Sequence, residues 1–447
     1  MRAVLGDDVP VQVVLPDGST VGKADAPMRI LVRSPAAYAH MLRAPGELGL
    51  VRAYVSGALD VEGDLGAAVS LGDRLDAGHI HPRQVLGLAR SLGVDLVRNP
   101  PPIPPEEIVG HRNPVTRHTK ERDASSVSHH YDVSNDFYRL ILGPSMTYSC
   151  ATFSSDDDSL EQAQQNKVEL VCRKLALAPG MRLLDVGCGW GAMVLHAARY
   201  HGVDAVGVTI SREQYEYATA AVEAAGLSHR VEIRLQDYRD IADGPYDAIS
   251  SIGMFEHVGH RQLQAYFAKL QSLLRDEGRL LNHQIGRRPY EQRRIGRDRT
   301  TMNSRGLMNR YVFPDGELHE VGDLVETMQR LGLEVRHVES LREHYDRTLK
   351  LWEANLDAHW AQAAAIAGEG RTRVWKLYIA ASAVMFRLNR LQVHQILAVN
   401  VNEQTGRSAM GWRPTWETNL RTAAYSIDQT ADVIDVRDPS SADQPRS

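Results

Sequence analysis

Short apolar runs alternate with amphipathic segments over the central part of the chain. Apolar and β-branched residues gather in runs that predict strands at residues 182–186, 205–209, 231–235, 248–252 and 278–281. Between these runs, apolar positions recur with helical spacing at residues 192–200, 213–225 and 262–274. Strands that alternate with helices are typical of an α/β fold, so we expect a Rossmann-like, doubly wound sheet.

A weaker strand pattern precedes this region. Residues 11–15 and 29–32 predict strands, and amphipathic segments follow them, so we expect a small α+β domain over residues 1–98. Five prolines between positions 100 and 105 then break the pattern, and the mixed-charge stretch after them has no apolar periodicity. Residues 99–126 are therefore predicted to be a proline-rich linker.

The alternation of strands and helices is interrupted after the fifth predicted strand. Residues 286–320 lack it, residues 345–393 are strongly helical, and a last strand is predicted at 395–401. We expect the insertion and the helices to form a lid on a domain that spans residues 127–428. The tail at 429–447 is rich in Asp, Ser and Pro and is predicted to be disordered.

Composition narrows the class of protein and its compartment. The 447-residue chain has a net charge of -5, so no bulk basic field favours nucleic-acid binding. Its three cysteines, Cys150, Cys172 and Cys188, lack a C-x-x-C spacing, so we expect neither a disulfide framework nor a metal site. Asp7 and Asp8 stand where a signal peptide needs apolar residues, and no run approaches the ~18 residues of a membrane span. A cytoplasmic location is expected.

A glycine-rich turn follows the first strand of the predicted sheet. Residues 183–191 read Leu-Leu-Asp-Val-Gly-Cys-Gly-Trp-Gly, and such a turn lets a ligand approach the backbone at the carboxyl ends of the strands. The dinucleotide fingerprint is Gly-x-Gly-x-x-Gly with an acidic residue about 20 positions later, whereas Val-Thr-Ile-Ser ends the second strand here. Asp185 and Asp237 can anchor another nucleoside-like cofactor. The alternative is a turn that merely permits tight helix packing.

Several separate segments carry a family resemblance. They are His-His-Tyr-Asp-Val-Ser-Asn-Asp-Phe-Tyr at 129–138, Met-Thr-Tyr-Ser-Cys at 146–150, the glycine turn, Gly-Met-Phe-Glu-His-Val-Gly at 253–259, Tyr-Val-Phe-Pro-Asp-Gly at 311–316 and His-Tyr-Asp-Arg-Thr-Leu at 344–349. Over about residues 126–401, these segments occur in the same order as in the cyclopropane-fatty-acid synthases and their mycolic-acid-modifying relatives, which the chain resembles. The N-terminal domain is similar in placement to the extra domain of the full-length bacterial enzymes, and we expect it to associate with lipid or membrane.

This resemblance implies a class I methyltransferase fold that binds S-adenosylmethionine (SAM), and a homodimer. The cofactor contacts carried over by motif are Tyr148, Ser149, Asp185, Gly187, Gly189, Gly191, Thr209, Gln214, Asp237 and Tyr238. The family also holds a bicarbonate ion near the sulfonium. The positions that match that ion site are Cys150, Glu256, His283, Ile285 and Tyr345.

The implied chemistry explains why these groups are needed. An alkene is a weak nucleophile, so the sulfonium methyl must be aligned with the double bond in a pocket without water. One proton must then leave, and bicarbonate held by Glu256, His283 and Tyr345 can accept it. Each of these residues also has a structural reading: Glu256 as a helix cap, His283 as a core histidine and Tyr345 as an interface tyrosine. We interpret Cys150 as a wall of the ion site, because a thiol in an apolar pocket stays protonated.

A local cluster of arginines indicates where lipid could be met. Residues 287–310 hold eight arginines against two acidic residues. Near a membrane surface each basic side chain contributes ~1 kcal/mol of attraction to anionic headgroups, which suits a peripheral enzyme acting on phospholipid acyl chains. A solvated loop is the alternative.

Four hypotheses on function follow from the sequence. The first is cyclopropane formation at a cis double bond of an unsaturated phospholipid acyl chain. The second is a methylene- or methyl-branched fatty acid formed from the same cation. The others are a small-molecule O- or N-methyltransferase and a non-catalytic lipid-binding module.

Overall fold

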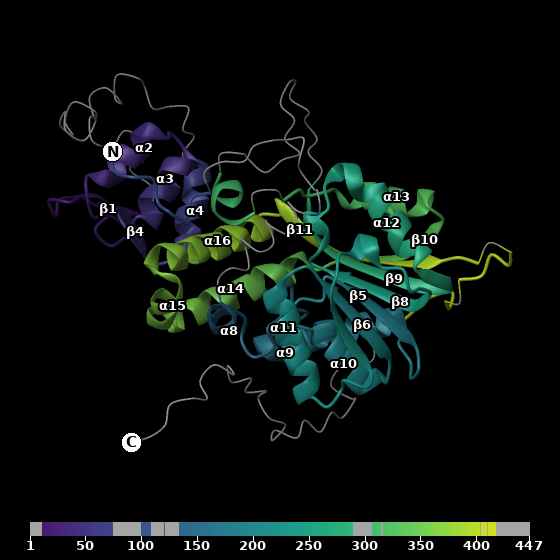
Figure 1. Cartoon of the computed structure of the whole chain (residues 1–447). Helices are drawn as coiled ribbons and strands as arrows, with labels where there is room; N and C mark the ends of the chain where they lie inside the picture. Colours follow the sequence, from purple (N-terminus) through teal and green to yellow (C-terminus); the bar gives the residue numbers. More distant parts are fainter. Residues whose placement is uncertain are drawn as a thin grey trace, which may run out of the picture. The chain divides into compact units, whose positions relative to one another are not determined.

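The chain forms two compact units in a computed structural model, shown in Figure 1. The structure describes residues 11–74, 100–108, 120, 134–288, 306–313, 316–402, 404–408 and 410–416. The larger unit comprises Thr116–Glu291, Glu317–Thr348 and Leu391–Ser447. The smaller comprises Met1–Val115, Gln292–Gly316 and Leu349–Arg390. The first motif residues at 129–133, most of the arginine cluster and the predicted disordered tail lie outside the described residues.

A seven-stranded sheet forms the centre of the larger unit. Its strands are β5 (Arg182–Val186), β6 (Asp204–Thr209), β7 (Val231–Leu235), β8 (Tyr246–Ile252), β9 (Leu274–Arg287), β10 (Leu333–Ser340) and β11 (Leu391–Asn400). They lie in the order β10-β11-β9-β8-β5-β6-β7. Strands β5 to β9 pair in parallel, whereas β11 pairs antiparallel with both β9 and β10. The predicted doubly wound sheet is confirmed, and it carries an antiparallel edge.

Helices cover both faces of this sheet. One face packs against α12 (Leu263–Ser272) and α13 (Val321–Arg330), and the other against α9 (Leu160–Leu175), α10 (Ala192–His201) and α11 (Arg212–Ala224). Two hydrophobic clusters result, one on each side of β5, which contributes Leu184 to the first and Leu183 to the second. This double burial explains why β5 reads as a continuous apolar run.

Serine caps fix where several helices begin. Ser134, Ser159 and Ser211 accept hydrogen bonds from backbone amides in the first turns of α8 (Asn135–Leu142), α9 and α11. Such caps satisfy amide groups that have no partner inside the helix. They fix the register of α9 and α11, and both helices carry polar residues of the candidate site.

The smaller unit combines a four-stranded sheet with helices. Strands β1 (Gln12–Val14), β2 (Thr20–Gly22), β3 (Arg29–Val32) and β4 (Leu59–Glu62) lie in the order β2-β1-β3-β4. Its helices are α2 (Ala36–Arg43), α3 (Glu47–Val55), α4 (Leu65–Arg74), α15 (Trp360–Ala367), α16 (Glu369–Arg387) and the π-helical turn Met308–Val312. Helix α14 (Arg342–Ala358) begins in the larger unit and ends in the smaller one.

Two groups of ion pairs join distant segments within the smaller unit. Arg373 of α16 lies 3.2 Å from Asp60 of β4, and Glu107 pairs with Arg52 at 2.6 Å and with Arg310 at 3.3 Å. Helix α16 and the Met308–Val312 turn, which the sequence assigns to the lid, are thus bonded to N-terminal segments of this unit. The domain limits and the lid role stay predictions.

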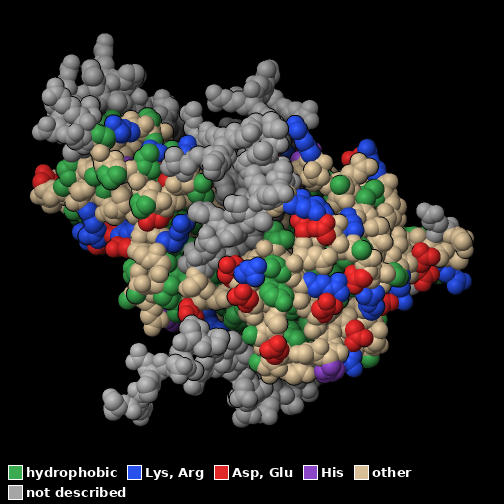
Figure 2. Space-filling view, viewed as in Figure 1, with side chains coloured by type: hydrophobic (Ala, Val, Ile, Leu, Met, Phe, Trp, Pro, Cys, Tyr) green, Lys and Arg blue, Asp and Glu red, His purple; other side chains and the backbone are tan. Residues whose placement is uncertain are grey.

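The described surface carries both signs of charge. Figure 2 shows acidic and basic side chains interspersed on the face in view, in line with the modest net charge. Among the described residues, no helix combines the length and apolarity that crossing a membrane requires.

Candidate functional site

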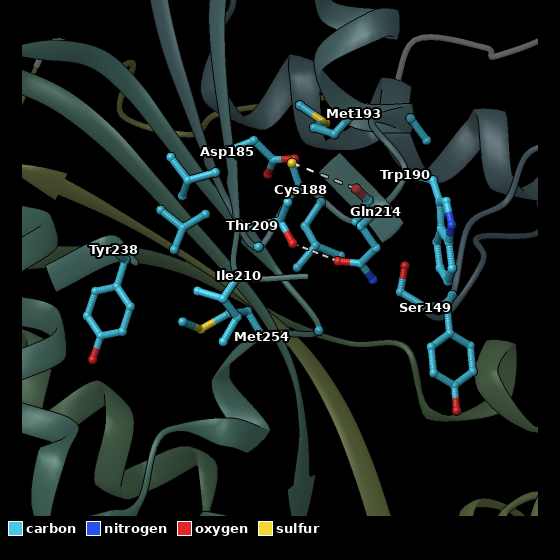
Figure 3. Close-up of a pocket in the computed structure, with 18 of the residues that line it drawn as sticks. Ser149, Asp185, Cys188, Trp190, Met193, Thr209, Ile210, Gln214, Tyr238 and Met254 are labelled. Atoms are coloured by element: carbon cyan, nitrogen blue, oxygen red, sulfur yellow. Dashed lines mark hydrogen bonds between the residues drawn. The ribbon is translucent and has the colours of Figure 1, made fainter. Parts of the chain in front are cut away.

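A pocket opens at the carboxyl ends of the parallel strands in the larger unit. Of the cofactor residues predicted from the sequence, it is lined by Tyr148, Ser149, Asp185, Gly187, Gly189, Thr209, Gln214, Asp237 and Tyr238, and Gly191 alone does not line it. In Figure 3, Tyr238 lies on one side, Trp190 and Ser149 on the other, and Thr209 between them. Residues from several separate segments thus converge where open α/β sheets bind ligands.

The glycines of the turn have different roles. Gly187 has φ +77°, and an added Cβ would lie 2.8 Å from side-chain atoms of Met254. Gly189 has φ +55° with nothing within 4 Å of an added Cβ, so it faces open space. Gly191 caps α10, and its added Cβ would lie 3.2 Å from Ala218. Close packing therefore describes Gly187 and Gly191, whereas Gly189 leaves its side of the backbone open; Gly187 and Gly189 both line the pocket.

Two buried ionisable groups form the floor of the pocket. Asp185 accepts a 2.6 Å hydrogen bond from the Ser250 hydroxyl, and burial raises the pKa of Asp185 to about 6. Lys167 of α9 donates to the Ser149 hydroxyl at 3.0 Å, and burial lowers its pKa to about 8. Lys167 was not predicted from the sequence, because it precedes the first strand of the sheet and reaches the pocket only through helix packing.

The segment that contributes Tyr148 and Ser149 is fastened to α9. The Gln164 amide donates to the carbonyl oxygens of Thr147 and Ser149 at 3.3 and 2.9 Å. Together with Lys167, it fixes the backbone and one hydroxyl of this wall. Gln164 is a further positioning residue that the sequence motifs do not mark.

Polar residues after β6 and β7 define the opposite part of the pocket. Thr209 donates from its hydroxyl to the Gln214 side chain at 2.8 Å (Figure 3). The Asp237 carboxylate receives hydrogen bonds from the Arg239 guanidinium at 2.8 and 2.6 Å. Burial opposes ionisation of Asp237, but these bonds outweigh it and lower the pKa below its usual range. Asp237 is therefore a charged, oriented acceptor.

The predicted ion-site residues include a second buried acid beside the sheet. Glu256 follows β8, and its Oε1 atom accepts a 2.6 Å hydrogen bond from the Ile285 amide of β9. Its Oε2 atom is buried and has no partner among the described residues. Burial raises the pKa of Glu256 to about 7, because the Ile285 bond compensates only in part. This carboxyl group can thus change protonation state near neutral pH.

His283 of β9 offers an oriented donor. The Gln395 carbonyl accepts from the Lys174 ammonium at 2.6 Å, so the Gln395 amide nitrogen must donate to His283 Nδ1, 3.2 Å away. Burial holds the pKa of His283 well below its usual range, so the ring is neutral. Its proton then sits on Nε2, a buried atom without a partner among the described residues.

Cys150 and Tyr345 are brought toward the same part of the sheet by backbone contacts. The Cys150 thiol lies 3.6 Å from the carbonyl oxygen of Leu341, and Tyr345 follows one turn later on α14. Leu341 also donates to Val393, which pairs with Ile285 across β11 and β9. Cys150 and Tyr345 are both buried, and burial raises the pKa of the thiol, which is therefore neutral. A contact chain thus links Cys150, Tyr345 and Ile285.

Glu256 Oε2 and His283 Nε2 are among the buried polar atoms that have no hydrogen-bond partner in the described structure. Leaving a buried donor or acceptor unsatisfied costs about 1–3 kcal/mol. Glu256 follows β8, and His283 pairs with Ile252, the last residue of that strand, so both residues belong to the same edge of the parallel strands. A small ion or a polar substrate group that accepts from His283 would remove the penalty.

Comparison with solved structures identifies the class of fold. The solved structure of mycolic acid cyclopropane synthase CmaA1 complexed with SAH and CTAB matches with a TM-score of 0.57 at 36% identity, over 62% of this chain and 98% of that chain. Its fold is that of the class I SAM-dependent methyltransferases, and so is the fold of this chain. The protein is therefore a methyltransferase enzyme, and SAM is its methyl donor.

Sequence comparisons give the family. The family model described as mycolic acid cyclopropane synthetase matches residues 118–396. A probable fatty acid methyltransferase of Mycobacterium tuberculosis is 44% identical over 91% of this chain and 95% of its own length. The cyclopropane-fatty-acyl-phospholipid synthase of Escherichia coli is 39% identical over 60% of this chain and 66% of its own length. The chain belongs to the mycolic acid cyclopropane synthetase family, which confirms the resemblance stated from the motifs.

Proposed function

We propose that this protein transfers a one-carbon unit from SAM to the cis double bond of an unsaturated phospholipid acyl chain and forms a cyclopropane. The observation that carries the proposal is the buried pair of unpaired atoms, Glu256 Oε2 and His283 Nε2. Methyl transfer to oxygen or nitrogen would use a general base but has no need of an ion site, whereas alkene methylation leaves a cation from which a proton must be removed.

The pocket fits SAM by the chemistry of its lining. A sulfonium cofactor that joins an amino acid to a nucleoside needs close backbone approach, charged groups at one end and hydroxyl or amide partners at the other. Gly187 and Gly189 provide the approach, Asp185 and Ser149 lie at the floor, and Asp237 is a charged acceptor. When bound, the cofactor supplies an electrophilic methyl group. The chain's own residues fix its orientation and exclude water.

The second polar site fits bicarbonate. His283 Nε2–H would donate to one oxygen of the ion, and Glu256 would hold another through its carboxyl group. When bound, bicarbonate supplies the base that accepts the proton from the methylated chain. The neutral Cys150 thiol, Ile285 and Tyr345 would form walls that hold the ion in place. Omission of bicarbonate should therefore lower turnover of the protein, and adding it back should restore turnover.

To reach the double bond of an acyl chain, the enzyme must bind at a lipid surface. The arginine cluster at 287–310 would attract anionic headgroups, and residues 1–98 would assist as a lipid-associating domain. Accordingly, the protein would act in the cytoplasm at the membrane surface, as a peripheral enzyme and a homodimer.

A branched product is the second candidate, and a relative's name favours it. The Mycobacterium tuberculosis relative that aligns with 91% of this chain is called a probable fatty acid methyltransferase. The same cation would lose a proton from a neighbouring carbon instead of from the added methyl group, which gives a branched alkene. The two outcomes differ in the placement of one base.

Analysis of cellular lipids tests the proposal and separates the two products. Fatty acid methyl esters from cells that express the gene are examined by gas chromatography and mass spectrometry, with Glu256→Gln as the matched inactive control. We expect cyclopropane chains with the native protein and none with the variant. A branched alkene as sole product would overturn the cyclopropane assignment, and unmodified acyl chains would overturn the whole proposal.

A further inference from the structure

A cluster of metal-binding side chains lies on the helices behind the pocket. Cys172 of α9 and His196 and His201 of α10 place one ligand atom each within 4.8 Å of one another. Glu169, one turn before Cys172, has its Oε2 atom 3.0 Å from His196 Nε2 and 3.0 Å from His201 Nε2. Two imidazoles therefore converge on one carboxylate oxygen beside a thiol.

The spacing of these atoms suits a tetrahedral ion. Ligand atoms about 2.0–2.1 Å from a tetrahedral zinc ion lie about 3.3 Å apart, close to the observed separations from Glu169 to the two imidazoles. A thiolate at about 2.3 Å would complete such a shell, and the Cys172 sulfur lies within 4.8 Å of the ligand atoms of both histidines. Cysteine and histidine together select zinc and similar ions over magnesium or calcium.

We propose that Cys172, His196, His201 and Glu169 bind one divalent ion of the zinc class. This inference is independent of the reaction proposed above. It departs from the expectation of no metal site, which rested on the absence of a C-x-x-C spacing. Sequence spacing fails here because the ligands come from two helices that meet only in the fold: α9 and α10 pack on the same face of the sheet.

Charge supports the assignment. A thiolate and a carboxylate together neutralise a divalent cation, so the ion and its four ligands would carry no net charge in a largely buried place. Burial raises the pKa of the Cys172 thiol, and ion binding would release that proton to solvent, one for each ion bound. Arg173 donates to the other oxygen of Glu169 at 2.7 Å and so orients the carboxylate.

The site is open enough for an ion to enter. The side chains of His196 and His201 are 14% and 17% exposed, whereas that of Glu169 is 8% exposed. The bound ion would join α9, which carries Lys167, to α10, which begins at the glycine turn. It would act as a structural link behind the cofactor pocket and stabilise the folded state by mass action.

Cobalt titration tests the proposal directly. Untagged protein is dialysed against a chelator and titrated with Co²⁺, and the thiolate-to-cobalt charge-transfer absorption is recorded together with the thermal midpoint. We expect the band to saturate at one ion per chain, the midpoint to rise, and Zn²⁺ to abolish the band. His201→Gln should weaken binding at least about tenfold, in the range that loss of one coordinating or supporting group produces.

Matched variants distinguish this site from other thiols and histidines. Cys172→Ser should remove the band, whereas Cys188→Ser and the exposed His229→Gln should keep it, with circular dichroism as a check of folding. A wild-type protein that shows no saturable band and retains no ion would overturn the proposal. A band that persists in folded Cys172→Ser would overturn it as well.

Discussion

His283 and Glu256 each present one polar atom to the interior, and their roles follow from what holds the rest of the side chain. Gln395, oriented by Lys174, fixes the proton of His283 on Nε2. The Ile285 amide occupies one oxygen of Glu256 and leaves the other unpaired. In the proposed function, these two oriented atoms would bind the ion, in the manner of preorganised catalytic groups.

Glu256→Gln tests whether this pair serves the reaction. The amide keeps the shape but cannot ionise, so we expect turnover to fall by about 10²-fold or more while SAM affinity stays close to that of the native protein. Single-turnover lipid assays and calorimetry measure the two quantities. The exposed Glu223→Gln serves as the matched control and should change neither. A parallel loss of SAM binding would instead make Glu256 structural.

The raised pKa of Glu256 also predicts a pH dependence of stability. Because its folded pKa of about 7 exceeds the ordinary 4.5, the folded state binds more protons between these values, and stability falls as pH rises through that window. Asp185, with a pKa of about 6, acts in the same direction in both proteins. The thermal midpoint of Glu256→Gln should therefore decline less than that of the native protein between pH 5 and about 7.5. Parallel curves would argue against a perturbed Glu256.

At the scale of elements, the glycine turn and the strands around it organise the cofactor pocket. The turn places Gly187 against Met254 of the segment after β8, and Gly189 toward open space. Both have left-handed backbone conformations, yet only one is also crowded. Substitutions at the two glycines can therefore separate the energetic cost of a positive φ from the cost of a steric clash.

Gly187→Ala and Gly189→Ala form a matched pair. Each pays about 1 kcal/mol for its positive φ, and the first adds a clash at 2.8 Å with Met254. We expect Gly187→Ala to be destabilised by about 2 kcal/mol or more and Gly189→Ala by about half as much, measured by urea unfolding without SAM. Equal decreases in the free energy of unfolding would show that Met254 moves away from the added methyl group without destabilising the fold.

The strands show what the sequence can and cannot predict. Strand β5 was predicted with the observed limits, because a central strand with apolar residues on both faces forms a short continuous run. Strand β7 lies at an edge and was also predicted with its limits, because apolar and charged residues alternate regularly in Val-Glu-Ile-Arg-Leu. Strand β10 was not predicted: as an edge strand, it intersperses charged and apolar residues in Leu-Glu-Val-Arg-His-Val-Glu-Ser. A bulge between Val335 and His337 also breaks the regular alternation on which such a prediction depends.

The candidate site also contains some residues that the sequence could indicate and others that it could not. The sequence could place Glu256 and His283 at the same edge of the sheet, because Glu256 follows β8 and His283 pairs with the last residue of that strand. Lys167 and Gln164 could not, because they lie on a helix before the sheet begins and reach the pocket through packing alone. The cluster around Glu169 was missed for the same reason, since its side chains meet only when α9 and α10 pack together.

At the scale of the whole molecule, attraction to lipid must come from a local feature. The net charge is -5, and both signs of charge are mixed over the face in Figure 2. Arg293, Arg294 and Arg297 belong to the arginine-rich segment, which lies outside the described residues. Because the segment is rich in arginine, we expect it to attract anionic headgroups.

Replacing Arg293, Arg294 and Arg297 together with glutamine should weaken co-sedimentation with anionic vesicles. The loss should be large at low salt and small at high salt, because ions screen surface charges beyond about 8 Å at physiological ionic strength. Neutral vesicles provide the control and should bind both proteins equally. Unchanged binding to anionic vesicles would reject the headgroup role of this segment.

The central claim is one-carbon transfer from SAM to an acyl double bond. Purified protein is incubated with SAM that carries a deuterated methyl group and with vesicles of a cis-unsaturated phospholipid, and the acyl chains are analysed by mass spectrometry and NMR. We predict chains that have lost the double bond and gained a ring CD₂ group, since one deuteron leaves with the base. Unlabelled acyl chains, or an intact CD₃ group on oxygen or nitrogen, would contradict the account.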